Sequence, residues 1–165
     1  MHEFETERLS MRLLKAEDKE FFTGLYCDPK TMKLIAKPLT EEQSNVMFER
    51  SLTHIEGANP KELIWVIRVK ATQEIIGIQN LFIFGKSPED ADAGLILTRT
   101  AHGKGYPNEA TAAVMDYGLK NLGIRTFHTN CSARNYAIQR VIRAMGFVES
   151  TESSDEQVHY FKNVQ

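Results

Sequence analysis

The amino-acid sequence predicts a mixed α/β fold with one principal sheet. Short β-rich runs recur from residue 7 to residue 161, and segments with helical spacing separate them. Their order (β, helices, ββ, β, α, β, α, ββ) is typical of helices packed on a single sheet. The composition indicates a globular chain, since 42% of the 165 residues are hydrophobic and 25% are charged. We therefore expect one domain, residues 1–165, with a single core.

The first half of the chain is expected to form a strand, three helical segments and a hairpin. Thr40 and Gln43 have the spacing of a capping box, which predicts a helix that starts after Thr40 and ends at Gly57. Gly77 interrupts the second strand of the hairpin, which indicates a bulge or a close approach of another backbone. The predicted strands span residues 7–14, 63–69 and 75–84, with a turn at 71–74, and the helical segments span 16–26, 31–35 and 40–56.

The second half of the chain alternates strands and helices. Pro107 fits the first position of one helix, where its missing N–H would be unpaired in any case, and Gly123 is expected to end that helix. Asn135 is expected to cap a second helix, and Gly146 to stand just past its end. A polar connection is predicted at 85–92, strands at 93–98, 124–131 and 158–161 with a further strand beginning at 147–148, and helices at 107–122 and 136–145.

Composition argues against several classes of partner. The formal net charge is −2, whereas nucleic-acid binders usually carry a basic face, so no nucleic-acid partner is expected. No run of eighteen apolar residues occurs and the acidic N-terminus lacks the layout of a signal peptide, so no membrane partner is expected. Cys27 and Cys131 form no CxxC pair, which favours a reducing, cytoplasmic location. The five histidines show no metal-ligand spacing, so no metal site is expected.

The stretch from His102 to Ala110, HGKGYPNEA, carries the main functional signal. It follows a predicted strand and opens a predicted helix, and Gly103 and Gly105 allow several backbone N–H groups to turn toward one hollow. The N-terminus of the helix adds unpaired donors and the positive end of its dipole. This arrangement predicts a phosphate-binding cradle. The alternative is an ordinary strand-to-helix turn whose own geometry requires glycine.

Three further stretches stand in a fixed order around this glycine loop. They are ETERLSMR from residue 5, EIIG from residue 74, and a helix that carries Asn135, Arg140-Val141 and Gly146-Phe147. Together with Gly103-Lys104-Gly105-Tyr106 and Glu109-Ala110 they resemble the GNAT superfamily of N-acetyltransferases, in its ribosomal-protein (RimJ/RimL-like) branch. In this resemblance the glycine loop is similar to the family's acetyl-CoA pyrophosphate loop. The resemblance spans the chain from about Thr6 to Phe147.

The resemblance implies a fold, an activity and a cosubstrate. It implies a mostly antiparallel central sheet of about seven strands, flanked by helices and splayed between the fourth and fifth strands. It implies transfer of an acetyl group from acetyl-CoA to a primary amine, either a protein N-terminus or a small amine, by direct attack in a ternary complex. A monomer or a homodimer is compatible with it. The residues implied to bind acetyl-CoA are Leu97, Thr98, His102, Gly103, Lys104, Gly105, Tyr106, Asn108, Glu109, Asn135 and Arg140.

The sequence departs from the family pattern at four positions. His102 replaces the usual Gln or Arg of the loop, and Pro107 at the end of the loop cannot donate an N–H. Ile138 stands where the branch has a serine, and Ile142 where many members have a catalytic tyrosine. These departures keep a second function open, a non-catalytic acyl-CoA-binding sensor or interaction module with the same fold.

Three residues are candidates for the acid and base steps. Asp92 is the candidate base, because a carboxylate at the start of a strand could take the amine proton directly or through water. The alternative is that Asp92 merely belongs to the acidic turn that starts at Glu89. Tyr136 and Ser132 are the candidate acids, and the alternative for both is a capping or packing role.

Other reactive side chains are expected to be structural or solvated. Cys131 is expected to be a small packed residue and not a nucleophile, because no histidine partner stands at a readable spacing. Acidic residues could make the acceptor entrance negative and attract a cationic amine, or they could form only a solvated turn. These residues are Asp90, Asp92, Glu149, Glu152, Asp155 and Glu156.

Overall fold

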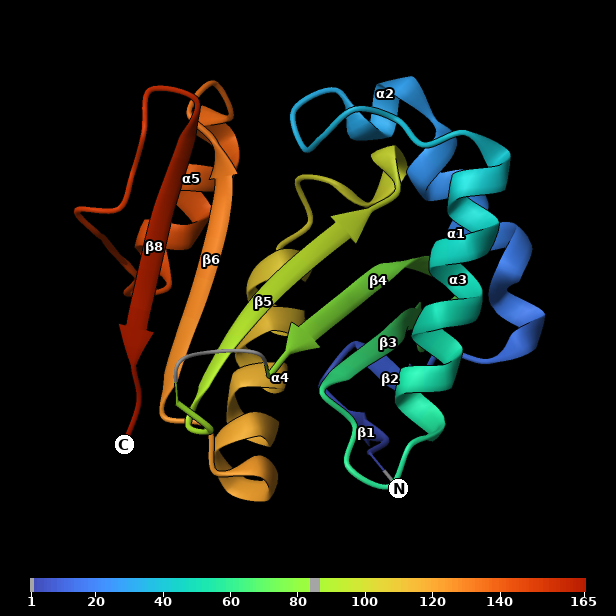
Figure 1. Ribbon diagram of the computed structural model, residues 1–165, viewed down its shortest axis with the longest axis horizontal. Helices are drawn as coiled ribbons and strands as arrows, with labels where there is room; N and C mark the ends of the chain where they lie inside the picture. The colour runs from blue at the N-terminus through green and yellow to red at the C-terminus, as the bar shows by residue number, and fades with distance from the viewer. Residues whose placement is uncertain (1, 84–86) are drawn as a thin grey trace.

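The computed structural model describes residues 2–83 and 87–165, which form one sheet of eight strands with helices on both faces (Figure 1). The end of the predicted strand 75–84 and the start of the predicted connection 85–92 lie outside the described residues. The strand order is β1-β2-β3-β4-β5-β6-β8-β7, and all neighbours are antiparallel except β5 and β6. The predicted mixed, mostly antiparallel sheet is confirmed, and the strand beyond the seven expected is β1, which is too short to show a periodicity. The strands are β1 (Phe4–Glu5), β2 (Leu9–Leu13), β3 (Glu62–Val69), β4 (Ile75–Phe82), β5 (Asp90–Leu97), β6 (Thr126–Ser132), β7 (Val148–Glu149) and β8 (Gln157–Asn163).

Two groups of helices cover opposite faces of the sheet (Figure 1). The sheet divides the single core expected from the sequence into two apolar layers, one with Phe22 and Phe48 and the other with Trp65, Val114 and Phe127. Full burial of one such side chain stabilises the fold by about 1.5–3 kcal/mol. The first group is α1 (Lys19–Cys27), α2 (Pro29–Met32) and α3 (Glu41–Glu56), and the second is α4 (Tyr106–Leu122) and α5 (Tyr136–Ala144).

Three of the predicted capping residues occupy the expected positions at the ends of α3 and α5. Thr40 Oγ1 accepts from the Gln43 amide at 3.1 Å while Gln43 Oε1 accepts from the Thr40 amide at 3.0 Å, which confirms the capping box of α3. Asn135 Oδ1 accepts from the Ile138 amide at 3.2 Å and so caps α5. Gly146, just past α5, has a left-handed φ of 86°, which confirms its predicted place.

Strands β3 and β4 form the predicted hairpin, with Gly77 at an irregular point. The register shifts between Ile67, which lies opposite Gly77, and Arg68, which lies opposite Ile75, so one residue of β4 bulges out. A Cβ on Gly77 would also lie 2.3 Å from the carbonyl oxygen of Ile96 on β5. Both parts of the sequence-based interpretation of this glycine, a bulge and a close backbone approach, are confirmed.

Two helix starts differ from the sequence-based expectation. α2 begins at Pro29 and not at residue 31, because the Asp28 carboxylate accepts from two amides of that turn and caps it. α4 begins at Tyr106 with Gly105 as its N-cap, which puts Pro107 at the second helical position and not the first. Proline is still tolerated there, because the first four amides of a helix have no intrahelical acceptor.

Strands β5 and β6 separate toward one end of the sheet, and this separation positions the site described below. They pair only over Asp90–Asp92 and Thr126–His128 and then diverge (Figure 1). The splay expected between the fourth and fifth predicted strands is thereby confirmed, since β5 and β6 correspond to them. Beyond Asp92 the edge of β5 that faces β6 has no strand partner among the described residues. Such an edge presents backbone donors and acceptors to a ligand.

Candidate functional site

A cavity of about 280 Å³ occupies the space between the separated ends of β5 and β6. Its wall combines residues of β4, β5, β6 and α5, the start of α4, and the segment around α2. Met32 and Ile96 belong to the apolar layer under α1–α3, while Ala93 and Ile142 belong to the layer under α4 and α5. The cavity therefore reaches both faces of the sheet. It borders the layer under α1–α3 on one face and the layer under α4 and α5 on the other.

The glycine loop meets this cavity at Pro107, which is part of the cavity wall. The chain leaves β5 through a short 3-10 turn, η2 (Arg99–Ala101), and enters α4 after Gly105. Gly103 and Gly105 have left-handed φ values of 76° and 77°, a conformation that costs other residues about 1–2 kcal/mol. A Cβ on Gly103 would meet no atom within 4 Å, so the backbone conformation and not the space requires glycine there.

Five backbone amides of the loop and of the first turn of α4 have no hydrogen-bond acceptor in the described part of the chain. They belong to residues 103–106 and to Asn108. Pro107 has no N–H. The Glu109 amide donates to the Gly105 carbonyl oxygen at 3.3 Å, so Asn108 is the last residue of the loop and first turn with a free amide. These amides stand at the positive end of the dipole of a 17-residue helix. The loop thus has the free donors that the predicted phosphate cradle requires.

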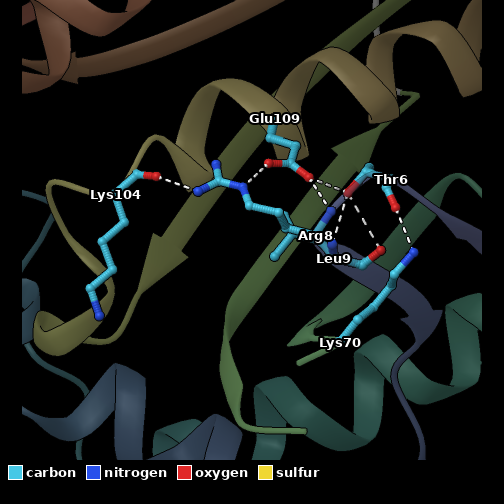
Figure 2. A network of polar contacts seen from close by, with 6 residues as sticks. All are labelled: Thr6, Arg8, Leu9, Lys70, Lys104 and Glu109. Atoms are coloured by element: carbon cyan, nitrogen blue, oxygen red, sulfur yellow. Dashed lines mark hydrogen bonds and ion pairs between the residues drawn. The ribbon is translucent and has the colours of Figure 1, made fainter. Parts of the chain in front are cut away.

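An ion pair holds the loop against the N-terminal part of the chain (Figure 2). Arg8 Nε donates to Glu109 Oε2 at 2.7 Å, and Arg8 Nη1 donates to the Lys104 carbonyl oxygen at 2.8 Å. The guanidinium carbon also lies 4.5 Å from the centroid of the Tyr106 ring. Arg8 therefore contacts both the middle of the loop and the first turn of α4, and it restrains one relative to the other.

The Glu109 carboxylate has two more donors, so that Thr6, Arg8 and Glu109 form one network, which we call the loop clamp. Glu109 Oε1 accepts from the Thr6 hydroxyl at 2.5 Å and from the Arg8 amide at 2.8 Å (Figure 2). Burial by itself would raise the pKa of Glu109, but the hydrogen bonds from Thr6 and Arg8 outweigh burial and hold this pKa below its ordinary value. The carboxylate is therefore ionised near neutral pH. The sequence places these residues in two separate motifs, and only the fold joins them.

The remaining predicted acetyl-CoA residues differ in their surroundings, and of them Asn135 lines the cavity. Asn135 lines the cavity while its side chain caps α5. Leu97 ends β5 with a buried side chain, and Thr98 follows it. The side chains of His102, Lys104 and Arg140 are exposed. The structure thus brings the loop and Asn135 to one cavity, and the binding roles of all these residues stay predictions.

The three predicted catalytic residues do not line the cavity. Asp92 is exposed and is the last residue of β5 that pairs with β6. Tyr136 is 73% exposed at the start of α5. Ser132 Oγ accepts from the Arg134 amide at 3.2 Å, which is a turn-capping contact. Their catalytic roles stay predictions without a supporting contact to the cavity.

Two adjacent residues of β4, Gln79 and Asn80, line the cavity and were not identified from the sequence. Gln79 Nε2 donates to the Gly94 carbonyl oxygen at 2.8 Å, and Gln79 Oε1 accepts from the Thr111 hydroxyl at 3.2 Å. Asn80 Oδ1 is buried without a hydrogen-bond partner among the described residues, and a Cβ on Gly94 would lie 2.3 Å from it. The sequence did contain a signal for these two residues, because they are adjacent amide side chains inside an otherwise apolar strand.

Tyr26 and Cys131 are the ionisable side chains in the described wall of the cavity, and both are neutral near neutral pH. Burial raises the pKa of Tyr26 to about 12, with a smaller contribution from the Glu62 carboxylate. Burial also raises the pKa of the Cys131 thiol, which argues against a thiolate nucleophile. Within residues 2–83 and 87–165 there is no group of three His, Cys, Asp or Glu side chains suited to a metal ion. Nor does this part of the chain contain a helix with the length and apolar character needed to span a membrane.

The chain is similar to known proteins in sequence and in fold. Residues 8–148 match the family model described as an acetyltransferase (GNAT) domain. The chain is 27% identical over 146 residues to the uncharacterised N-acetyltransferase p20 of Bacillus licheniformis, covering 86% of this chain and 80% of that protein. It is similar to the spermidine N-acetyltransferase of Vibrio cholerae solved with CoA and spermine (TM-score 0.83, 18% identity, 96% of each chain covered). It is also similar to the ribosomal L7/L12 α-N-protein acetyltransferase RimL solved with coenzyme A (TM-score 0.79, 15% identity, 96% of each chain covered).

Proposed function

Because the chain belongs to the GNAT acetyltransferase family, we propose that it transfers an acetyl group from acetyl-CoA to a primary amine by direct attack in a ternary complex. The observation that carries this proposal is the group of five free amides in the glycine loop beside the cavity. Phosphate oxygens need such donors, and the cavity leaves room next to them for the reacting groups. The CoA bound in two similar structures supports the choice of cosubstrate. The agreement of four motifs, with RimL among the similar structures, supports the RimJ/RimL-like branch.

In this proposal the pyrophosphate of acetyl-CoA binds the free amides of the loop. Pro107 leaves one gap in this row of donors, but its fixed φ stiffens the helix start that carries the others. The amide groups of the pantetheine arm can pair with the free edge of β5 beyond Asp92, as an added strand would. Glu109 acts through the loop clamp and not by direct contact. Leu97, Thr98, His102, Asn135 and Arg140 complete the proposed binding site.

The reaction forms a bond between the amine nitrogen and the acetyl carbonyl carbon and breaks the carbon–sulfur bond of the thioester. The amine nitrogen loses one proton and the leaving sulfur gains one, so the products are the N-acetyl amine and free CoA. Holding both reactants in line supplies much of the rate acceleration. A thiol with a pKa of about 8.5 can leave without a dedicated acid, which fits the exposed position of Tyr136. Asp92, outside the cavity wall, is proposed to accept the amine proton through water.

Thiol release from acetyl-CoA over a panel of primary amines tests the activity, and a charge substitution tests the cradle. Gly105→Glu should abolish CoA binding because it adds a negative charge next to the proposed phosphate donors, at a position where a Cβ would lie 3.3 Å from Arg8 Nη2. Gly105→Ala is the matched control, since it carries the same strain from a φ of 77° and the same close contact of a Cβ with Arg8 without the charge. Equal CoA affinity of the two variants in a calorimetric titration would overturn the cradle assignment.

A second candidate function is a non-catalytic acyl-CoA-binding module. It is favoured by one observation, that no predicted catalytic side chain lines the cavity. Tight CoA binding without thiol release on any amine would establish this module in place of the enzyme. A cytoplasmic location, a monomeric or homodimeric state, one domain over residues 1–165, and the absence of a nucleic-acid partner stay predictions.

A further inference from the structure

We propose that the acceptor is a primary amine whose remaining part is apolar and carries no second cationic group. This inference rests on the proposed acetyl transfer, and it concerns the part of the cavity on the α1–α3 face of the sheet. It is carried by a described wall without charged side chains, by exposed apolar residues in that wall, and by one buried amide oxygen that has no hydrogen-bond partner among the described residues.

The described wall of the cavity contains no Asp, Glu, Lys, Arg or His side chain. Its ionisable groups, Tyr26 and Cys131, are neutral near neutral pH because burial raises the pKa of each. An ammonium group that enters such a wall loses its hydration without gaining a carboxylate partner, which opposes binding. A diamine or polyamine would bring a second ammonium group to this wall, whereas an apolar monoamine would not.

The acidic residues that could have attracted a polycation lie elsewhere. Asp90 and Asp92 stand at the paired start of β5, and the acidic residues of the last hairpin do not line the cavity either. Three of them already have a basic neighbour. Asp90 lies 3.5 Å from His128, Glu149 lies 3.7 Å from Arg143, and Glu152 lies 3.7 Å from His159. Of the two interpretations left open by the sequence, a solvated acidic turn fits these contacts better than a negative acceptor entrance.

Apolar side chains make up the part of the wall that follows α2. Leu34 and Ile35 are 39% and 40% exposed, and Tyr26 and Met32 continue the wall inward. Single exposed apolar residues are common on protein surfaces. These two differ because they share the wall of one cavity, so an apolar occupant would remove both from water. That gain rises with the apolar area covered and favours an acceptor with an aliphatic or aromatic body.

The same wall favours the form of the amine that reacts. An amine attacks a thioester only as the neutral base. Desolvation in an apolar wall lowers the pKa of a bound amine, and the described wall has no carboxylate that would raise it again. Asn80 lines the cavity, and its buried Oδ1 has no hydrogen-bond partner in the described chain. Turning this amide exchanges its oxygen and nitrogen, so the oxygen can face the occupant. A neutral amide oxygen accepts an N–H from the amine, but it does not stabilise the ammonium form as strongly as a carboxylate would. We therefore assign to the Asn80 amide oxygen the role of accepting an N–H from the amine nitrogen that reacts.

Two amines of equal chain length separate an apolar acceptor from a dicationic one. Hexylamine and 1,6-diaminohexane both have six carbon atoms and differ at the far end, where one hydrogen of the terminal methyl group is replaced by an ammonium group. With saturating acetyl-CoA and thiol release as the readout, we expect kcat/KM for hexylamine to exceed that for 1,6-diaminohexane, and that for spermidine, by about tenfold or more.

A carboxylate placed in the wall should shift this preference. Ile35→Asp adds a partner for a second ammonium group, and we expect it to reduce the ratio of the two kcat/KM values by about tenfold. Val46→Asp is the matched control, because Val46 is 65% exposed on α3 and does not line the cavity. Both positions are exposed, so a carboxylate at either is compatible with the fold, and the control should keep the ratio of the unmodified protein.

The outcomes separate this inference from the function on which it rests. Acetylation of 1,6-diaminohexane or spermidine as efficient as that of hexylamine overturns the inference and leaves acetyl transfer intact. A ratio that Ile35→Asp leaves unchanged overturns the assignment of this wall to the acceptor. Absence of thiol release with every amine overturns the proposed acetyl transfer, and the inference with it.

Discussion

Replacing Arg8 with alanine should raise the KM for acetyl-CoA while changing kcat little. The substitution removes the donor to Glu109 Oε2 at 2.7 Å, the donor to the Lys104 carbonyl oxygen at 2.8 Å, and the guanidinium above the Tyr106 ring. The Thr6 hydroxyl and the amide of residue 8 would still bind Glu109 Oε1, so α4 keeps its attachment. The restraint that is lost is the one on the loop itself.

The size of this effect follows from the exposure of the contacts. A hydrogen bond to a charged group contributes about 1.5–3 kcal/mol when shielded from water, whereas exposed ion pairs contribute about 0–1 kcal/mol. The Arg8 side chain is 42% exposed, so the low end applies. With about 0.5–1 kcal/mol for the contact to the ring, the set amounts to about 1–2 kcal/mol. If this free energy orders the loop for phosphate binding, CoA affinity should fall by about 5–30-fold.

Calorimetric titration of CoA, steady-state kinetics and thermal unfolding separate binding from stability. Lys120→Ala is the matched control, because Lys120 pairs with Asp116 at 2.8 Å on the same helix but near its opposite end. This control should leave CoA affinity within about twofold of the unmodified protein, as expected for an exposed ion pair. A folded Arg8→Ala variant with unchanged CoA affinity would refute the role assigned to the clamp, and so would a fall in kcat at constant KM.

Three further predictions concern Glu109, Gly105 and Asp92. The lowered pKa of Glu109 means that its contribution to stability is present above the ordinary glutamate value of 4.5 and is lost as the pH falls through the lowered pKa. The difference in unfolding free energy between the unmodified protein and Glu109→Gln, from urea titrations, should therefore stay constant from about pH 7 to about pH 5 and shrink at lower pH; growth of the difference on acidification would contradict this. Gly105→Ala should lower the unfolding free energy by about 1–2 kcal/mol because of its left-handed φ, and its Cβ, 3.3 Å from Arg8 Nη2, would also displace that flexible side chain slightly. Gly24→Ala is the matched control, because Gly24 lies within α1 where a Cβ meets no atom within 4 Å, and it should raise the unfolding free energy by up to about 1 kcal/mol. If thermal unfolding shows that both substitutions change stability in the same direction, Gly105 has no special conformational role. Asp92→Ala should lower kcat more than CoA affinity, and normal turnover across the pH range would remove Asp92 as the base.

Much of the fold could be predicted because its signals are local. The caps at Thr40 and Asn135 depend on side chains that accept from the amide three residues further on, and glycine is required at 103, 105 and 146 by the left-handed backbone angles of those residues. β1 was not predicted, because two residues carry no periodicity and are ordered by pairing with β2. The splay between β5 and β6 came from the family resemblance, since no pattern within either strand encodes where their pairing ends.

By itself, then, the sequence determined the glycine loop, the helix that follows it and the family, because backbone angles, caps and motif order are properties of neighbouring residues. The tertiary structure alone decided which side chains meet. Arg8 and Glu109 stand 101 residues apart and become partners only when the N-terminal segment docks on α4. Asp92, predicted at the site, lies outside the cavity wall, while Asn80 lies within it. The physical reason is that register and the alternation of side chains between the two faces of a sheet assign each strand residue its surroundings, and a step of one residue reverses them.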